Sequence, residues 1–182
     1  MSAIKILVGE HDVILRMIDV TRRLLADTTT VNIGHVEQIL DFIKNFADKY
    51  HHLKEEDVLF LEMEHHGMSR QSGPVGVMLH EHEQGRAYVK HAEEAILKFK
   101  SGNSQAVNEI KDNLLNYCAL LTNHIYKENN ILYPMAERLL PDAVMQAMSE
   151  HFDVAITATV NNEYADKYLK IAEELSRIYQ KE

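Results

Sequence analysis

The sequence predicts an all-α protein, an up-down-up-down four-helix bundle with additional C-terminal helices. Apolar residues recur at intervals of three and four along most of the 182 residues, which is the period of an α-helix. The chain contains only 7 Gly and 3 Pro, too few for the turns of a many-stranded β fold. The few breakers separate four long segments by short connections, and short connections favour antiparallel neighbours.

The first two helical segments are bounded by clear end signals. The first precedes a soft break at residues 26–30 and carries His11 on its apolar stripe. The second starts after Asn32, whose side chain suits a helix N-cap. It ends at a break over residues 66–74, in which Pro74 is suited to the first turn of the next helix. Each segment is therefore long enough for one helix of the bundle.

The third and fourth segments complete the bundle. The third ends at the polar break 101–104, and the fourth keeps the 3-4 spacing over residues 107–135 until Pro141. After Pro141 the pattern predicts a short helix and a longer one that pack outside the bundle. We therefore divide the chain into a four-helix bundle at 1–140 and a C-terminal helical extension at 141–182.

Composition and charge exclude several classes of function. A formal net charge of −9 argues against a nucleic-acid surface, because phosphate binding needs basic residues. No apolar run approaches the ~18 residues that cross a bilayer, and the start lacks a targeting signal, so we expect a cytoplasmic protein with no membrane partner. A single cysteine excludes a disulfide framework and a cysteine-based metal site. The 11 histidines are the unusual count.

The second and fourth segments contain the same short sequence motif, or phrase. His51-x-x-x-Glu55 in the second segment matches His124-x-x-x-Glu128 in the fourth at a constant offset of 73 residues. A lysine inside the phrase and a leucine after it are identical in the two copies. The offset pairs His124 with His51 rather than with its neighbour His52.

The first and third segments also echo each other. Glu-His-Asp at residues 10–12 resembles Glu-His-Glu at residues 81–83, at an offset of 71. Each half of the chain therefore carries one His followed by one His-x-x-x-Glu. Residues four apart point in directions about 40° apart on one helix face. The four histidines lie at similar distances from the connecting loops, so antiparallel packing brings them to one level together with both glutamates.

This donor set indicates a metal site. One histidine on a core stripe is usually a hydrogen-bonded core residue, but two buried carboxylates need partners or a metal. Four imidazoles and two carboxylates are more ligands than a single tetrahedral zinc ion needs. The set is also too rich in nitrogen for calcium or magnesium. Two octahedral ions fit, since these donors fill about 8 of 12 positions and an oxo or hydroxo bridge brings this to about 10. The remaining positions leave room for a small molecule.

Over roughly residues 8–140 the chain resembles the hemerythrin-like HHE cation-binding domain family, whose pattern is H…HxxxE…H…HxxxE. The matching residues are His11, His51, Glu55, His82, His124 and Glu128. The resemblance implies a four-helix bundle that holds two iron ions in a non-haem di-iron centre. It also implies that the two glutamates bridge the irons and that the histidines are terminal ligands.

The sequence determines further ligands and pocket residues less closely. Hemerythrins proper take a fifth histidine from an HxxxH motif in the third helix, where this chain has Arg86. We leave open whether His52 or His35 is a further ligand. Tyr117 lies on the inner stripe of the fourth segment, where it packs in the core or lines a pocket, and we expect Cys118 to be a core residue. We expect surface or supporting positions for the other histidines, which are His65, His66, His80, His91 and His151.

We expect a metal-binding protein that binds or senses dioxygen or a related small ligand, nitric oxide or peroxide. A histidine-rich site with only two carboxylates carries less negative charge than a carboxylate-rich oxidase site, which favours the ferrous state and reversible binding. One alternative is a di-iron enzyme that decomposes peroxide or oxidises a small substrate, and another is iron storage or sensing. The sequence leaves open the metal, the physiological ligand, the electron partner and the oligomeric state, including a homo-oligomer built on the C-terminal helices.

Overall fold

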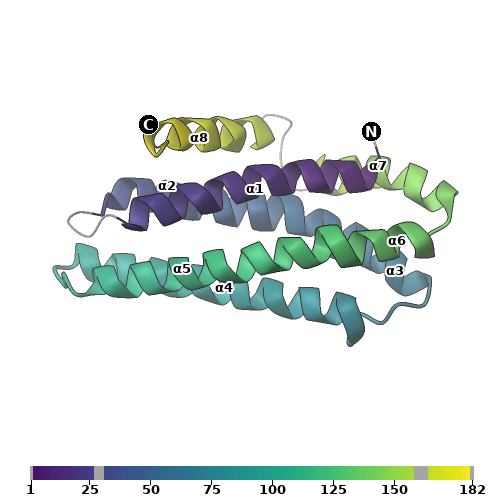
Figure 1. Cartoon of the computed structure of the whole chain (residues 1–182), viewed down its shortest axis with the longest axis horizontal. Helices are drawn as coiled ribbons and strands as arrows, with labels where there is room; N and C mark the ends of the chain where they lie inside the picture. Colours follow the sequence, from purple (N-terminus) through teal and green to yellow (C-terminus); the bar gives the residue numbers. More distant parts are fainter. Residues whose placement is uncertain (1, 27–30, 158–163, 181–182) are drawn as a thin grey trace.

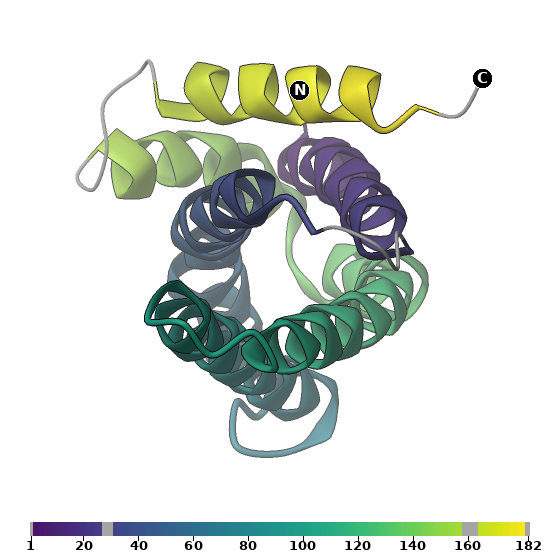
Figure 2. The same ribbon diagram turned by 90° about the vertical axis from the view of Figure 1, so that its left-hand side faces the viewer.

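The described residues form four antiparallel helical rods and two further helices that lie outside them (Figure 1). The computed structural model describes residues 2–26, 31–157 and 164–180, and within these ranges the regular structure is helical, with no strand. Seen along the rods, the four of them surround a common axis and the two last helices cover one side (Figure 2). The predicted all-α bundle with additional C-terminal helices is confirmed.

The second and fourth rods each join α-helical and π-helical stretches, the latter marked η. The first and third rods are α1 (Ala3–Ala26) and α4 (Gly73–Lys100). The second rod runs through α2 (Ile33–Phe42), η1 (Ile43–His52), η2 (Glu55–Leu59) and α3 (Phe60–His65). The fourth rod runs through α5 (Ala106–Lys127), η3 (Glu128–Leu132) and α6 (Tyr133–Leu139).

The local end signals behave as the sequence predicts at two helix starts. Asn32 accepts a hydrogen bond of 3.1 Å from the backbone N–H of His35 and so caps α2. Pro74 lies in the first turn of α4. Just after the end of α4, Gly102 has a φ of 103°, a conformation that favours glycine. The first predicted break falls on residues 27–30, which lie outside the described residues.

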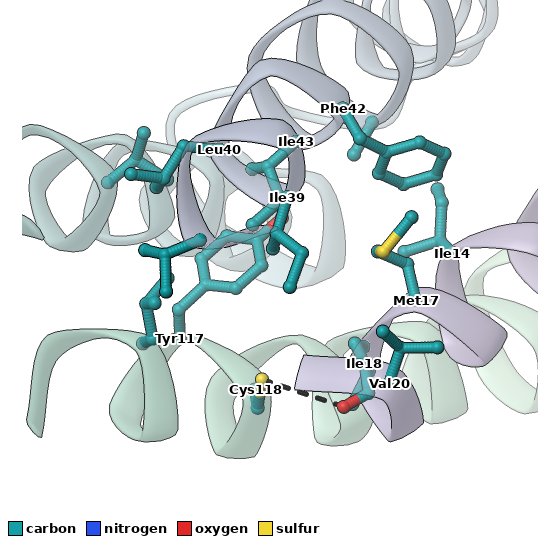
Figure 3. Close-up of a cluster of buried hydrophobic side chains, with 14 of the residues drawn as sticks. Ile14, Met17, Ile18, Val20, Ile39, Leu40, Phe42, Ile43, Tyr117 and Cys118 are labelled. Carbon is teal, nitrogen blue, oxygen red and sulfur yellow. Dashed lines mark hydrogen bonds between the residues drawn. The ribbon is translucent and has the colours of Figure 1, made fainter. Parts of the chain in front are cut away.

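Two hydrophobic clusters fill the bundle, one toward each end. The first includes Ile14, Phe42 and Tyr117 and holds α1, α2 and α5 together (Figure 3). The second includes Leu59 and Met63 and holds the other ends of the rods. Each fully buried large apolar side chain stabilises the fold by roughly 1.5–3 kcal/mol. The clusters therefore fix the rods on both sides of the polar layer that lies between them.

The C-terminal helices α7 (Asp142–Thr157) and α8 (Tyr164–Ile178) pack on the outside of the bundle (Figures 1 and 2). Phe152 of α7 joins the second hydrophobic cluster, and Leu175 of α8 joins the first. The division of the chain into two domains at residue 140 stays a prediction. Among the described helices, none combines the length and apolar character needed to cross a membrane.

Candidate metal centre

Seven buried polar side chains meet in the layer between the two hydrophobic clusters. All six residues that the sequence predicts are present, and a seventh, His52, joins them. Their exposed fractions lie between 0% and 6%. The seven residues are His11, His51, His52, Glu55, His82, His124 and Glu128.

The seven side chains form two groups, each able to hold a metal ion with ligand atoms that all lie within 4.8 Å of one another. We call them site A and site B, and Glu55 belongs to both. Site A contains His11, His51, Glu55 and Glu128. Site B contains His52, Glu55, His82 and His124.

The distances within the two groups match those between neighbouring ligands of one cation. The Nε2 atoms of His82 and His124 lie 3.0 Å apart. Glu128 reaches both sites, with one oxygen 3.2 Å from His11 Nε2 and the other 3.1 Å from His124 Nε2. Imidazole nitrogens bind metals such as zinc at about 2.1 Å, so two such donors at right angles are separated by about 3 Å. The groups are therefore compact enough for ligation without a large rearrangement.

Several candidate ligand atoms in this layer lack a hydrogen-bond partner among the described residues. They are Nε2 of His51, Oε2 of Glu55 and both carboxylate oxygens of Glu128. Leaving one polar group buried and unsatisfied costs roughly 1–3 kcal/mol, and more for a charged group. A cation in contact with these atoms satisfies all of them, so the donor set fits a metal.

Each of the five imidazoles is held from behind through its Nδ1 atom. Because carboxylate and amide oxygens accept hydrogen bonds, Nδ1 carries the proton and Nε2 faces the centre. Such outer partners orient metal-binding histidines and raise their basicity. The Nδ1 distances are 2.8 Å from His11 to Asn129, 2.9 Å from His51 to Glu10, 3.2 Å from His52 to Asp48, 2.7 Å from His82 to Glu56, and 2.9 Å from His124 to Glu81.

Arginine and lysine side chains pair with the carboxylates that hold the histidines. Arg86 donates hydrogen bonds of 2.7 Å to both Asp48 and Glu56, so one guanidinium fixes the anchors of two site B histidines. Lys54 pairs with Glu10, and Lys127 pairs with Glu81. Arg86 occupies the position at which an HxxxH motif has its second histidine. In this chain Arg86 therefore supports the site through the outer carboxylates.

A model of the hemerythrin HHE cation-binding domain matches residues 2–136. The chain belongs to the hemerythrin HHE cation-binding family. The resemblance proposed from the sequence is thereby confirmed over three quarters of the chain. No match was found among curated proteins or among solved structures. Cation binding is thus a property of the family, and this HHE domain has two groups of His and Glu that can hold a metal ion.

The sequence repeat of this HHE domain becomes an approximate two-fold relationship around the centre. The set Glu10, His51 and Lys54 in one half corresponds to Glu81, His124 and Lys127 in the other half. Among the corresponding pairs that differ, three lie next to the centre, and these are Glu56 with Asn129, Phe60 with Tyr133, and His52 with Ile125. The two sites therefore share one set of glutamate, histidine and lysine but differ in other residues that surround the candidate ligands.

The third of these differences explains why sequence reasoning left His52 undecided. In an α-helix His52 points about 100° away from His51. Here His51 and His52 end the π-helical stretch η1, in which each residue turns through a smaller angle. Both side chains therefore reach the centre, and the rings of His52 and His82 stack with their centroids 3.7 Å apart.

Both glutamates of the HHE domain also stand at the start of a π-helical turn. The N–H of Phe60 bonds to the carbonyl of Glu55, and the N–H of Tyr133 bonds to the carbonyl of Glu128, each five residues back. π-Helical turns are rare in proteins, and many of those that occur lie at functional sites. The same local distortion in both halves is consistent with a repeated structural role for the two glutamates.

Burial and neighbouring charges set the protonation of the ligand atoms. Burial lowers the pKa of His51 well below its usual value, and burial together with His52 lowers the pKa of His82 to about 3. Burial opposes the charge of His124, but Glu128 and Glu81 raise its pKa to about 9. A cation that binds to His124 therefore replaces a proton. Burial and the proximity of Glu128 raise the pKa of Glu55.

The other histidines of the HHE-family chain lie outside both sites. His35, the second candidate for a further ligand, is hydrogen-bonded at 2.7 Å to the hydroxyl of Tyr179. His66 is half-buried and bonds to the carbonyl of Glu62. The exposed ones are His65, His80, His91 and His151. Of the alternatives left open by the sequence, the structure brings only His52 to the centre.

Proposed function

We propose that this chain is a non-haem di-iron protein that binds or senses dioxygen or a related small ligand, nitric oxide or peroxide. The single observation that carries the proposal is the set of buried, unpartnered atoms of His51, Glu55 and Glu128 that converge at the centre. Family membership supports cation binding, and the mixed imidazole and carboxylate donors suit a first-row transition metal such as iron.

The proposed ligands are the six residues predicted from the sequence together with His52. In this assignment Glu55 is shared by both sites, and Glu128 spans them with its two oxygens. The iron pair supplies redox chemistry and binding of the small ligand. The chain's own residues hold the imidazole lone pairs in place through their Nδ1 bonds and keep water away with the apolar layers on either side.

A second candidate is a di-iron enzyme that acts on peroxide or on a small oxidisable substrate. The observation that favours it is a cavity of about 160 Å³ beside site B, which is larger than a diatomic ligand needs. Iron storage or sensing is the third alternative, and a buried centre with so few donors favours it less than the first two.

Metal analysis and anaerobic reduction test this proposal. We expect the purified chain to hold about two iron atoms, as two octahedral sites require. Reduction followed by exposure to air should give a reversible charge-transfer band if the protein binds dioxygen, whereas turnover of added peroxide supports the enzyme. A chain that holds fewer than about one transition-metal ion after purification and reconstitution contradicts the whole assignment.

A further inference from the structure

A cavity of about 160 Å³ lies against site B, between η1, α4 and α5. Its inner wall includes His52 and His82, so a molecule in the cavity contacts two imidazoles of the candidate centre. The remainder of the wall is largely apolar and includes Ile43, Val89 and Leu121. The cavity is therefore continuous with the centre through His52 and His82, while the other residues of its wall are not proposed ligands.

The size of the cavity indicates the size of its occupant. A cavity of about 150 Å³ in another protein accepts benzene, whereas a single water molecule takes up about 30 Å³. Gly85 lines this space, and a Cβ there would take up part of it, in van der Waals contact at 3.4 Å with a ring carbon of Tyr117. A dioxygen-sized ligand leaves most of the volume unfilled.

One buried side-chain oxygen of the residues that form the wall lacks a hydrogen-bond partner among the described residues. It is the hydroxyl of Tyr117, whose side chain extends from α5 toward Ile43 in the first hydrophobic cluster (Figure 3). The Tyr117 side chain is 3% exposed and lines the cavity. A buried hydroxyl without a partner is costly, so an occupant with one oxygen of its own fits better than a hydrocarbon.

The charged residues of the wall already pair with other side chains. Lys44 pairs with Glu93 at 2.7 Å, Arg86 pairs with Asp48, and Glu81 pairs with a lysine outside the cavity. The remaining cation, Lys90, is exposed. A charged occupant would lose water and find no unpaired counter-charge among the described buried residues of the wall, so the wall favours a neutral molecule.

We propose that this cavity binds a neutral, ring-sized organic molecule with one hydroxyl or carbonyl oxygen, held by the apolar wall and hydrogen-bonded to Tyr117. The bound molecule rests against His52 and His82 at site B. The inference goes beyond the proposed function, because it depends on the shape and polarity of the cavity and not on which metal the centre holds.

The test uses two fluorinated probes of equal shape on the reduced, metal-loaded full chain. Binding of 4-fluorophenol and fluorobenzene is followed by ¹⁹F NMR titration. Benzoate is the charged comparison, and its binding is measured by displacement of 4-fluorophenol. We expect saturable binding of 4-fluorophenol with a Kd of about 1 mM or tighter, which is usual for so small a ligand. Benzoate should bind at least about tenfold more weakly.

Two variants locate the site. Tyr117→Phe keeps the volume and removes the hydroxyl, so 4-fluorophenol should bind about tenfold more weakly while fluorobenzene is unaffected. Gly85→Ala narrows the cavity and should weaken both probes. Tyr126→Phe and Gly9→Ala are the matched controls, because Tyr126 is exposed and a Cβ at Gly9 meets no atom within 4 Å.

The outcomes separate this inference from the proposed function, because iron content is measured on the same samples. No saturable binding of either neutral probe overturns the inference, even where the iron content is as proposed. Equal affinities of wild type, Tyr117→Phe and Gly85→Ala also overturn it, as does tighter binding of benzoate than of 4-fluorophenol. Probe binding in a chain that holds no iron contradicts the proposed function alone.

Discussion

The hydroxyl of Tyr133 donates a hydrogen bond of 2.6 Å to Oε1 of Glu55. The corresponding residue in the other half of the repeat is Phe60, which has no hydroxyl. The Tyr133 ring stacks on His11 in site A with centroids 5.5 Å apart, and the Phe60 ring stacks on His82 in site B at 6.1 Å. The two sites thus have aromatic rings in equivalent places, and of these two rings the one stacked on His11 carries a hydroxyl.

We therefore expect Tyr133→Phe to weaken metal binding while keeping the fold. Loss of an outer hydrogen bond to a ligand costs about 10- to 100-fold in metal affinity. Competition with a chelator measures the affinity, and Tyr126→Phe, at an exposed position, is the control. An unchanged affinity in Tyr133→Phe means that the hydroxyl does not support Glu55 as a ligand.

His52 tests whether the two sites are unequal. If His52 is the third imidazole of site B, His52→Ala should reduce the iron content toward about one per chain or weaken one iron selectively. Mössbauer spectra distinguish the two irons of the proposed centre, and His66→Ala is the control because His66 lies outside both sites. Two irons with unchanged spectra in His52→Ala remove His52 from the ligand set.

The sequence predicts the helical class and the meeting of six donor residues for the same physical reason. Apolar stripes with a 3.6-residue period force one face of each rod inward, and the 73-residue repeat sets the donors at one level. His52 was undecided because its direction depends on the π-helical stretch η1, which the spacing of apolar residues does not reveal. The Asp48 partner of His52 lies four residues before it and is a local signal that sequence reasoning can use.

Other supports of the centre depend on contacts between rods. Glu10 contacts His51 and Arg86 contacts Asp48, in each case on a different helix. These pairs depend on how each helix is rotated about its own axis, which the spacing of residues along one helix does not determine. The cavity at Gly85 has the same origin, since a glycine inside a helix matters here only because Tyr117 approaches it from α5. The sequence allows Tyr117 either to pack in the core or to line a pocket, and in the structure it does both.

The paired carboxylates behind the histidines give a symmetric prediction. Glu10→Gln and Glu81→Gln each remove the charge that orients a histidine and neutralises a neighbouring lysine. We expect each variant to lose about 10- to 100-fold in metal affinity, measured by chelator competition. Glu64→Gln is the control, because Glu64 is exposed at the end of α3. Wild-type affinity in both variants contradicts a supporting role for these carboxylates.

Removal of the metal should destabilise the fold. A ligand present at about a thousandfold its Kd stabilises the native state by about 4 kcal/mol. For a chain of this size each kcal/mol shifts the Tm by roughly 2–4 °C, so the chelated protein should melt about 8–16 °C lower. Calorimetry with and without metal measures the shift. In His51→Ala, removal of the metal should change the Tm only slightly. An equal Tm with and without metal in the wild type excludes a structural contribution of the centre.

Cys118 should be inert in the folded protein. It is 1% exposed, packs in the first hydrophobic cluster, and its sulfur lies 4.0 Å from the carbonyl oxygen of Ile18 (Figure 3). Burial raises the pKa of its thiol to about 11, so at pH 8 the reactive thiolate is scarce. Iodoacetamide labelling followed by mass spectrometry should give no adduct under native conditions and a complete adduct in denaturant. Labelling of the native protein at the rate of a free thiol shows instead that the core around Cys118 opens readily.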